Sequence, residues 1–176
     1  FTVDHAKAVA KYNDVFVLFI HSNEDITEKR KVILNESEGL TEMTIYFKDK
    51  KWGLGPIDSI RTALKYIGVQ FGAYKYVQEH FGKADVVHVH TMLRATLLAK
   101  KLKRKFKIPY ILTEHWSGYD PNSANHIGTI KKKLTSYFIK KSDGVTTVSN
   151  YSGDQLKKIN SSVPYRVISN TLDADL

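Results

Sequence analysis

The second half of the chain alternates short apolar runs with amphipathic segments, and this alternation constrains the fold more than any other feature. The short runs, rich in residues that favour strands, lie at 85–90, 108–115, 143–149 and 165–169. Segments with apolar residues at helical spacing separate them, at 93–106, 127–142 and 150–159. Strands that alternate with helices over short connections form parallel sheets. The sequence therefore predicts an α/β fold with an open, mostly parallel sheet and helices on both faces.

The first half of the chain predicts a helix, a strand, a strand pair and a long helix. The helix covers 3–12, the buried strand covers 14–20, and the pair lies within 31–49 around a turn near Gly39. The long helix covers 55–82, and its apolar residues recur every three or four positions, which indicates one apolar stripe. The stripe consists of Ile57, Ile60, Leu64, Ile67, Phe71, Tyr74, Val77 and Phe81.

Length and composition are typical of one globular domain. The chain has 176 residues, 42% of them hydrophobic, which is enough to bury a core. It has no cysteine, which excludes disulfides and thiolate metal sites. No uninterrupted apolar run approaches the roughly 18 residues of a membrane span. Because the first residue is Phe1 and not Met, we expect further sequence upstream.

Polar residues follow the predicted strands at the point where each strand ends. In an open parallel sheet, ligands bind in the crevice beyond the carboxyl ends of the strands. The stretch "TEHW" at 113–116 thus marks where a buried strand opens onto a predicted binding crevice. The candidate site residues at these ends are His88, His90, Glu114, His115, Ser149, Asn170 and Asp173.

Several of these residues have a second interpretation. His88 and His90 lie two apart and point to the same side of a strand, as packed histidines or as metal ligands. In the metal interpretation, Glu114 or His115 would be a further ligand. Ser149 precedes a predicted helix, where it would cap the first turn or contribute to a phosphate site.

Positive charge is concentrated in the middle of the chain. Between Leu93 and Lys141 the sequence has 12 Lys or Arg against 2 Asp or Glu, within a formal net charge of +9 for the whole chain. This indicates either a solvated helix face or an anionic partner such as a membrane surface, a nucleic acid or an acidic glycan. Aromatic residues are not interleaved with the lysines, so a base-stacking site is not supported. The predicted anionic-surface residues are Lys100, Lys101, Lys103, Arg104, Lys105 and Lys107.

Three stretches together resemble the amino-terminal domain of glycosyltransferase family 4. They are "DVVHVHTMLRATLLAKKLKRKFKIPYILTEHW", "KKSDGVTTVSN" and "YRVISNTLDADL". The resemblance implies one Rossmann-like domain over 1–176, half of a GT-B architecture with two facing domains. It also implies that the family's first strand lies before Phe1, and that a carboxyl-terminal nucleotide-sugar domain is absent from this chain.

The resemblance also implies roles for the candidate residues. His115 matches a histidine near the transferred sugar and is the expected catalytic residue. The expected substrate-binding residues are His88 and His90 on the acceptor side, Glu114, Ser149, and the turn residues Asn170 and Asp173.

The implied activity is transfer of a hexosyl-type sugar from a nucleotide-sugar to a glycan or lipid-linked acceptor, with retention of configuration. The resemblance implies polysaccharide biosynthesis, no required metal or cofactor and no nucleic acid. The expected location is the cytoplasm, peripheral on the inner face of the membrane. This chain alone is expected to be inactive. The alternatives are a His-x-His metal-dependent hydrolase and a non-catalytic basic binding module.

Overall fold

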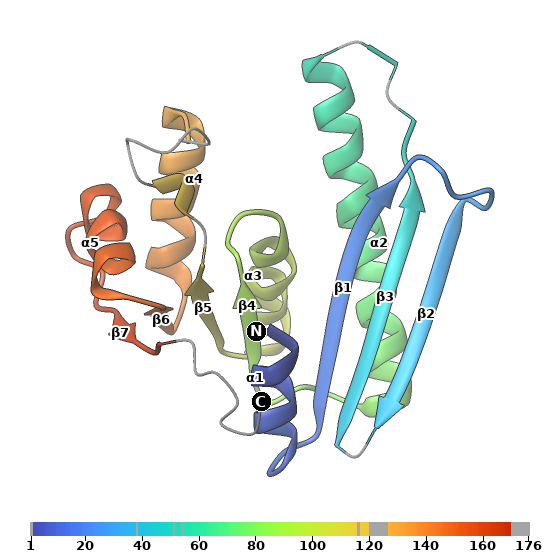
Figure 1. The fold of residues 1–176 in the computed structure, drawn as a ribbon, viewed down its shortest axis with the longest axis horizontal. Coiled ribbons are helices and arrows are strands. Elements are labelled where there is room, and N and C mark those ends of the chain that lie inside the picture. The colour runs from blue at the N-terminus through green and yellow to red at the C-terminus, as the bar shows by residue number, and fades with distance from the viewer. Residues whose placement is uncertain are drawn as a thin grey trace. The chain divides into compact units, whose positions relative to one another are not determined.

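The computed structural model describes residues 2–37, 39–50, 52–53, 55–115, 117–119 and 127–169, and it divides the chain into two compact units. The first unit covers 1–83 and the second covers 84–176. Each unit has its own hydrogen-bonded sheet (Figure 1), so each is described by itself. The sequence predicts one domain over 1–176. Because each of the two units is compact by itself, this stays a prediction.

The first unit contains a three-stranded sheet and two helices. They are α1 (Thr2–Ala10), β1 (Val15–Asn23), β2 (Arg30–Ser37), β3 (Leu40–Lys48) and α2 (Pro56–Phe81). The strand order is β1-β3-β2, with β1 parallel and β2 antiparallel to β3. Gly39 in the β2–β3 turn has a φ of +67°, and a Cβ there would lie 2.5 Å from the Ala10 carbonyl oxygen. The predicted strand pair and its turn are confirmed.

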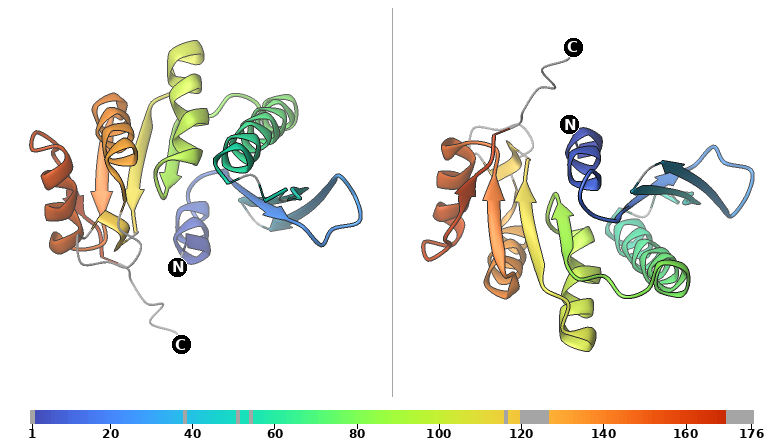
Figure 2. Two further views of the ribbon diagram at one scale, coloured as in Figure 1. Left: turned by 90° about the horizontal axis from the view of Figure 1, so that it is seen from above. Right: turned by 90° about the horizontal axis from the view of Figure 1, so that it is seen from below.

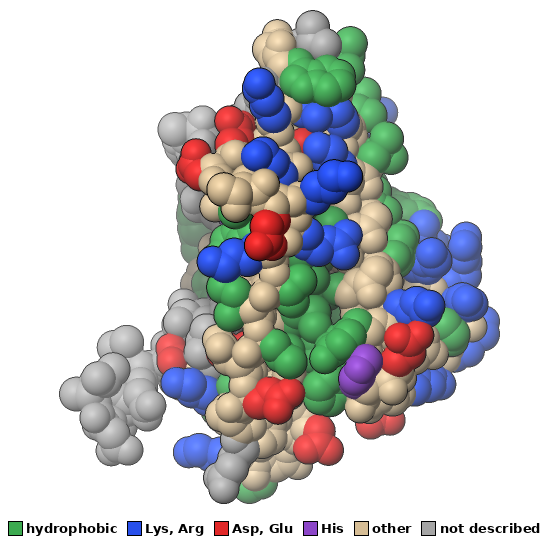
Figure 3. Space-filling view, turned by 90° about the vertical axis from the view of Figure 1, so that its right-hand side faces the viewer, with side chains coloured by type: hydrophobic (Ala, Val, Ile, Leu, Met, Phe, Trp, Pro, Cys, Tyr) green, Lys and Arg blue, Asp and Glu red, His purple; other side chains and the backbone are tan. Residues whose placement is uncertain are grey.

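The core of the first unit lies between β3 and α2. Met43, Ile45 and Phe47 alternate along β3 and are buried against Val69 and Ala73 of α2. The predicted alternation, with one face of the strand buried, is therefore confirmed. Figure 3 looks onto the side where β2 lies, and hydrophobic side chains are exposed there among charged ones.

The long helix α2 leaves the beginning of the predicted stripe exposed, although Tyr74 farther along the stripe is buried. Val69 and Ala73 face the core at 5% and 4% exposure, whereas Ile57, Ile60 and Leu64 are 60–64% exposed. The helix has apolar residues on two faces, and its spacing alone cannot tell which of them packs on the sheet. The beginning of the predicted stripe is thus the outer face of the helix.

The second unit contains a four-stranded sheet with the predicted alternation of strands and helices. Its elements are β4 (Val87–His90), α3 (Arg94–Phe106), β5 (Tyr110–Glu114), the 3₁₀ helix η1 (Ser117–Tyr119), α4 (Thr129–Lys141), β6 (Gly144–Thr147), α5 (Asn150–Ile159) and β7 (Arg166–Val167). The order is β4-β5-β6-β7 and every pair is parallel. The α/β, Rossmann-like fold is therefore confirmed.

The second unit has a core on one face of its sheet. Val89 of β4, Leu112 of β5 and Val145 of β6 pack with Ala99 of α3 and Ile139 of α4. Figure 2 shows α3 and α4 along the same side of this sheet. Because side chains alternate along a strand, residues next to these in the sequence point to the opposite face. Among the described residues, no helix has the length and apolar character to cross a membrane.

Asp143 ties the start of β5 to the segment that precedes β6. Its Oδ1 accepts a hydrogen bond from Lys103 Nζ at 2.7 Å, and its Oδ2 accepts one from the Tyr110 N–H at 2.9 Å. Partial burial opposes ionisation, but these two contacts outweigh it and hold the pKa of Asp143 below its ordinary value. A depressed pKa means that this carboxylate stabilises the fold above its ordinary pKa, and that the gain is lost as the pH falls.

Asp143→Asn should therefore lower the free energy of unfolding by about 1 kcal/mol at pH 7, because the site is partly exposed and solvent weakens the ion pair. The difference from the parent should shrink as the pH falls below 3.8, the ordinary pKa of Asp. Urea unfolding of both proteins at pH 7 and pH 3 measures it. A difference that is equal at both pH values would contradict the assignment.

Candidate active site

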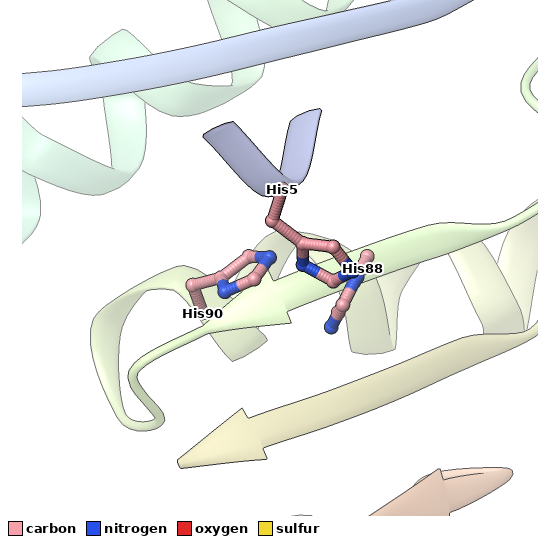
Figure 4. Close-up of side chains that lie close together, drawn as sticks. All are labelled: His5, His88 and His90. Atoms are coloured by element: carbon pink, nitrogen blue, oxygen red, sulfur yellow. The ribbon is translucent and has the colours of Figure 1, made fainter. Parts of the chain in front are cut away.

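Five polar side chains share one face of the second sheet, opposite the core. His88 and His90 come from β4, Thr113 and His115 from β5 and the residue after it, and Thr146 from β6. Figure 4 shows His88 and His90 projecting from β4, while the third labelled residue, His5, belongs to the first unit. The strands are parallel and in register, with His90 opposite Thr113 and Thr113 opposite Thr146. Alternation along each strand therefore places all five on the same face.

A hydrogen-bonded chain crosses three strands on this face. His88 Nε2 lies 2.5 Å from Thr113 Oγ1, and the Thr113 hydroxyl in turn hydrogen-bonds the Thr146 hydroxyl. The rings of His88 and His90 lie next to each other, with centroids 4.1 Å apart. The prediction that both histidines point to one side of their strand is confirmed.

His90 and His115 form a direct pair at the carboxyl end of the sheet. The distance from His90 Nδ1 to His115 Nε2 is 3.1 Å, and the rings are nearly parallel, 16° apart. One nitrogen donates the hydrogen and the other accepts it, so at least one ring is uncharged. Imidazoles linked in this way fix each other's orientation, and each ring has nitrogens that can donate or accept a hydrogen. The pair thus has the chemistry of a general acid or base.

Glu114 lies on the other face of β5, within the core, and is 1% exposed. Its Oε2 accepts hydrogen bonds from the Met92 N–H at 3.2 Å and the Tyr119 hydroxyl at 3.0 Å. Its Oε1 accepts one from the His115 N–H at 3.0 Å. Burial and the neighbouring Glu114 charge raise the pKa of Tyr119 well above its ordinary value. These contacts make Glu114 a positioning residue, and its predicted contact with substrate stays a prediction.

The turn between β4 and α3, which donates a hydrogen bond to Glu114, has an uncommon backbone conformation. Thr91 and Leu93, between β4 and α3, have φ angles of +66° and +76°. Left-handed conformations cost free energy for residues other than glycine, and they persist where the surroundings fix them. Here the Thr91 N–H donates to the Thr113 carbonyl at 3.0 Å, and Met92 between the two donates to Glu114. Because these contacts fix the turn, α3 begins at the carboxyl end of the sheet, where His90 and His115 lie.

Ser149 caps α5. Its Oγ accepts a hydrogen bond from the Ser152 N–H at 3.2 Å, so the N-cap interpretation is confirmed. Its contact with substrate stays a prediction. Asn170 and Asp173 lie outside the described residues.

Sequence reasoning did not single out Thr113, Thr146 or Tyr119. The signal for Thr113 was present, because it lies two residues before His115 and therefore on the same face of its strand. Thr146 could be placed beside it only once the register of β5 and β6 was known. Tyr119 follows the strand in η1, and no pattern in the sequence pairs it with Glu114.

The basic residues of α3 differ in their surroundings. Lys103 Nζ contacts both Asp143 and the Lys141 carbonyl oxygen, and Lys100 Nζ lies 4.7 Å from the centre of the Tyr137 ring. The other four predicted residues are exposed to solvent, namely Lys101, Arg104, Lys105 and Lys107. We call these four the exposed basic face of α3, although Lys107 directly follows the last residue of the helix.

The positions of His88, His90 and Glu114 test whether these three residues could bind one metal ion. Because alternation places Glu114 on the core face and His88 and His90 on the opposite face, Glu114 cannot join them around one ion without leaving its buried contacts. The structure therefore gives no support to a site built from these three residues.

Comparison with known protein families gives one result. The model of Glycosyltransferase Family 4 matches residues 47–176, which include the last two residues of β3, α2 and the whole of the second unit. No curated protein matches the chain. The family match covers most of the chain and confirms the resemblance that the sequence predicts. The chain belongs to glycosyltransferase family 4.

Proposed function

We propose that this chain is the acceptor side of an enzyme that transfers a sugar from a nucleotide-sugar to a glycan or lipid-linked acceptor, with retention of configuration. Membership of the family supports a glycosyltransferase. The observation that carries the rest is the His90–His115 pair, with nitrogens 3.1 Å apart, at the carboxyl end of a parallel sheet. That edge is where open α/β sheets bind their ligands.

In this reaction the bond between the anomeric carbon and the diphosphate oxygen breaks. The acceptor hydroxyl oxygen forms the new bond on the same face of the sugar, and its proton passes to the departing diphosphate. Negative charge builds on the diphosphate, where helix N-termini and basic side chains can stabilise it. The proposal therefore needs no metal or cofactor. His115 is the catalytic residue, hydrogen-bonding the sugar as charge develops, and His90 holds its ring.

The remaining candidates bind substrate in this proposal. His88 and His90 line the acceptor side, and the Thr113–Thr146 hydroxyls orient His88. Asn170 and Asp173 are assigned to substrate binding. Ser149 contributes through the α5 N-terminus that it caps, and Glu114 through the backbone of His115.

The function is tested with the full-length protein. It should release nucleoside diphosphate from one member of a panel of nucleotide-sugars, dependent on a glycan or lipid-linked acceptor and unaffected by EDTA. Nuclear magnetic resonance of the product should show the anomeric configuration of the donor. An inverted product would refute retention, and absence of transfer from the whole panel would refute the proposed activity.

The chain of 176 residues should bind nucleotide-sugars weakly, because the proposal assigns most nucleotide contacts to residues outside it. Calorimetry with common nucleotide-sugars should give no saturable heat up to about 1 mM, the upper end of usual substrate affinities. Micromolar binding by this chain would overturn the assignment of donor contacts.

The exposed basic face of α3 supports a peripheral location on an anionic membrane surface, at the cytoplasmic side where a lipid-linked acceptor would be presented. Lys101, Arg104, Lys105 and Lys107 would contribute about 1 kcal/mol each near such a surface. Binding of this kind is electrostatic and should weaken steeply with salt.

A further inference from the structure

The outer face of α2 is apolar over its first half. Ile57, Ile60 and Leu64 are 60%, 62% and 64% exposed, and their spacing of three and four residues places them on one side of the helix. Val69 and Ala73, on the opposite side, are buried against the sheet. A helix on the surface of a soluble protein normally carries polar residues on its outer face. Helix α2 has apolar residues on its outer face as well as on the face that packs on the sheet.

A tryptophan is fixed beside these residues. Trp52 is 62% exposed, and its backbone N–H donates to Asp58 Oδ2 at 3.0 Å, which ties it to the first turn of α2. The Arg61 guanidinium lies 4.4 Å from the centre of the Trp52 ring. Tryptophan, which has an apolar ring and a polar N–H, is enriched at the boundary between lipid headgroups and acyl chains. We call Trp52, Ile57, Ile60 and Leu64 the α2 apolar surface.

The segment that carries the α2 apolar surface is basic in balance. Between Lys48 and Tyr74 the sequence has five Lys or Arg and two Asp. The two acids, Asp49 and Asp58, are 4% and 7% exposed. Asp49 is bound by Lys65 at 3.0 Å and Arg61 at 3.3 Å, and Asp58 lies 3.6 Å from Arg61. The exposed formal charge of this segment is therefore basic.

We propose that the α2 apolar surface docks on an anionic lipid bilayer, with its four side chains inserted at the level of the headgroups. Apolar side chains with a tryptophan, flanked by basic residues, have the composition of helices that lie in the membrane interface. A second copy of the same surface would bring like charges together. The charge therefore favours an anionic lipid as the occupant.

This surface is distinct from the exposed basic face of α3, which lies in the other unit. Attraction between an anionic membrane and the exposed basic face of α3 would be electrostatic only, and it would be lost at high salt. Docking of the α2 apolar surface adds burial of hydrocarbon, which salt does not screen. The inference does not depend on the sugar-transfer proposal, since binding is measured without substrate.

Co-sedimentation with vesicles tests the proposal. The 176-residue chain should bind phosphatidylcholine vesicles that contain phosphatidylglycerol, and part of that binding should persist at high salt. Replacing Ile60 and Leu64 together with Glu should reduce binding at least tenfold, from the lost apolar burial alone. The matched control is Ile130→Glu, because Ile130 is 84% exposed on α4. Circular dichroism and urea unfolding confirm that each variant is folded.

Trp52 provides a second readout. The chain has two tryptophans, so in the Trp116→Phe variant the emission reports on Trp52 alone. Its emission should shift to the blue and be quenched by brominated lipid when anionic vesicles are added. Equal binding by the parent and the Ile60→Glu/Leu64→Glu variant, or Trp52 emission unchanged in vesicle-bound protein, would overturn the proposal. So would a folded parent that ignores anionic vesicles, or a concentration-dependent dimer that the double variant abolishes.

Discussion

Replacing His115 with alanine in the full-length protein is expected to lower the turnover rate by about 100-fold or more, because a contact made in the transition state is lost. The melting temperature should change little. The His115 side chain is only partly buried, and its contact is with His90 on the face opposite the core. Removing a partly exposed side chain leaves no closed cavity. Steady-state kinetics and thermal unfolding of the same preparation measure both quantities.

His80→Ala is the matched control, because His80 is an exposed histidine in the last turn of α2. It should leave both turnover and melting temperature unchanged. A core role for His115 predicts a marked fall in melting temperature, with activity lost only through unfolding. A His115→Ala protein that melts normally and transfers sugar at the parent rate would show that the residue has neither role.

The sequence predicted the strands and helices because their signals are local. The apolar run before "TEHW" becomes β5, and the spacing of Leu98, Ala99 and Leu102 gives the buried side of α3. The turn at Gly39 needs a positive φ that glycine adopts readily. Short parallel strands then follow from alternation with helices.

The packing of α2 could not be predicted in the same way. Its apolar residues occupy more than one side, so the spacing of Ile57, Ile60 and Leu64 fits a core face as well as an outer one. Only the position of the sheet, which buries Val69 and Ala73, decides between them. A helix with two apolar faces therefore needs tertiary information before either face is assigned.

The candidate site was predictable as a location and less so as a set of contacts. Parallel strands bring their carboxyl ends to one edge, so His90 and His115 could be expected near each other. The hydrogen bond between them depends on the pairing of β4 with β5, which places His90 opposite Thr113. Glu114 has the opposite orientation because it is one residue from His115 along an extended strand.

Glu114→Ala should lower the free energy of unfolding by about 3 kcal/mol or more, since each hydrogen bond to a buried charged group is worth about 1.5–3 kcal/mol. The alanine removes the carboxylate that accepts from the N–H groups of Met92 and His115 and from the hydroxyl of Tyr119. It also releases the turn at Thr91, whose positive φ has an intrinsic cost. Urea unfolding at pH 7 measures the loss.

Two further variants separate the contribution of one hydrogen bond from that of the carboxylate charge. Tyr119→Phe removes one donor and leaves the carboxylate its two backbone partners, so it should cost only about 1 kcal/mol. Glu114→Gln keeps an acceptor of the same shape but no charge, and its loss should fall between the two. In the full-length protein, Glu114→Gln should also reduce turnover, because the amide has one acceptor oxygen where the carboxylate has two, so the contacts to the His115 N–H and the Met92 N–H cannot both be kept. If Glu114→Ala unfolds at the same urea concentration as the parent, the buried carboxylate does not hold the turn, and the ordered start of α3 must depend on other contacts.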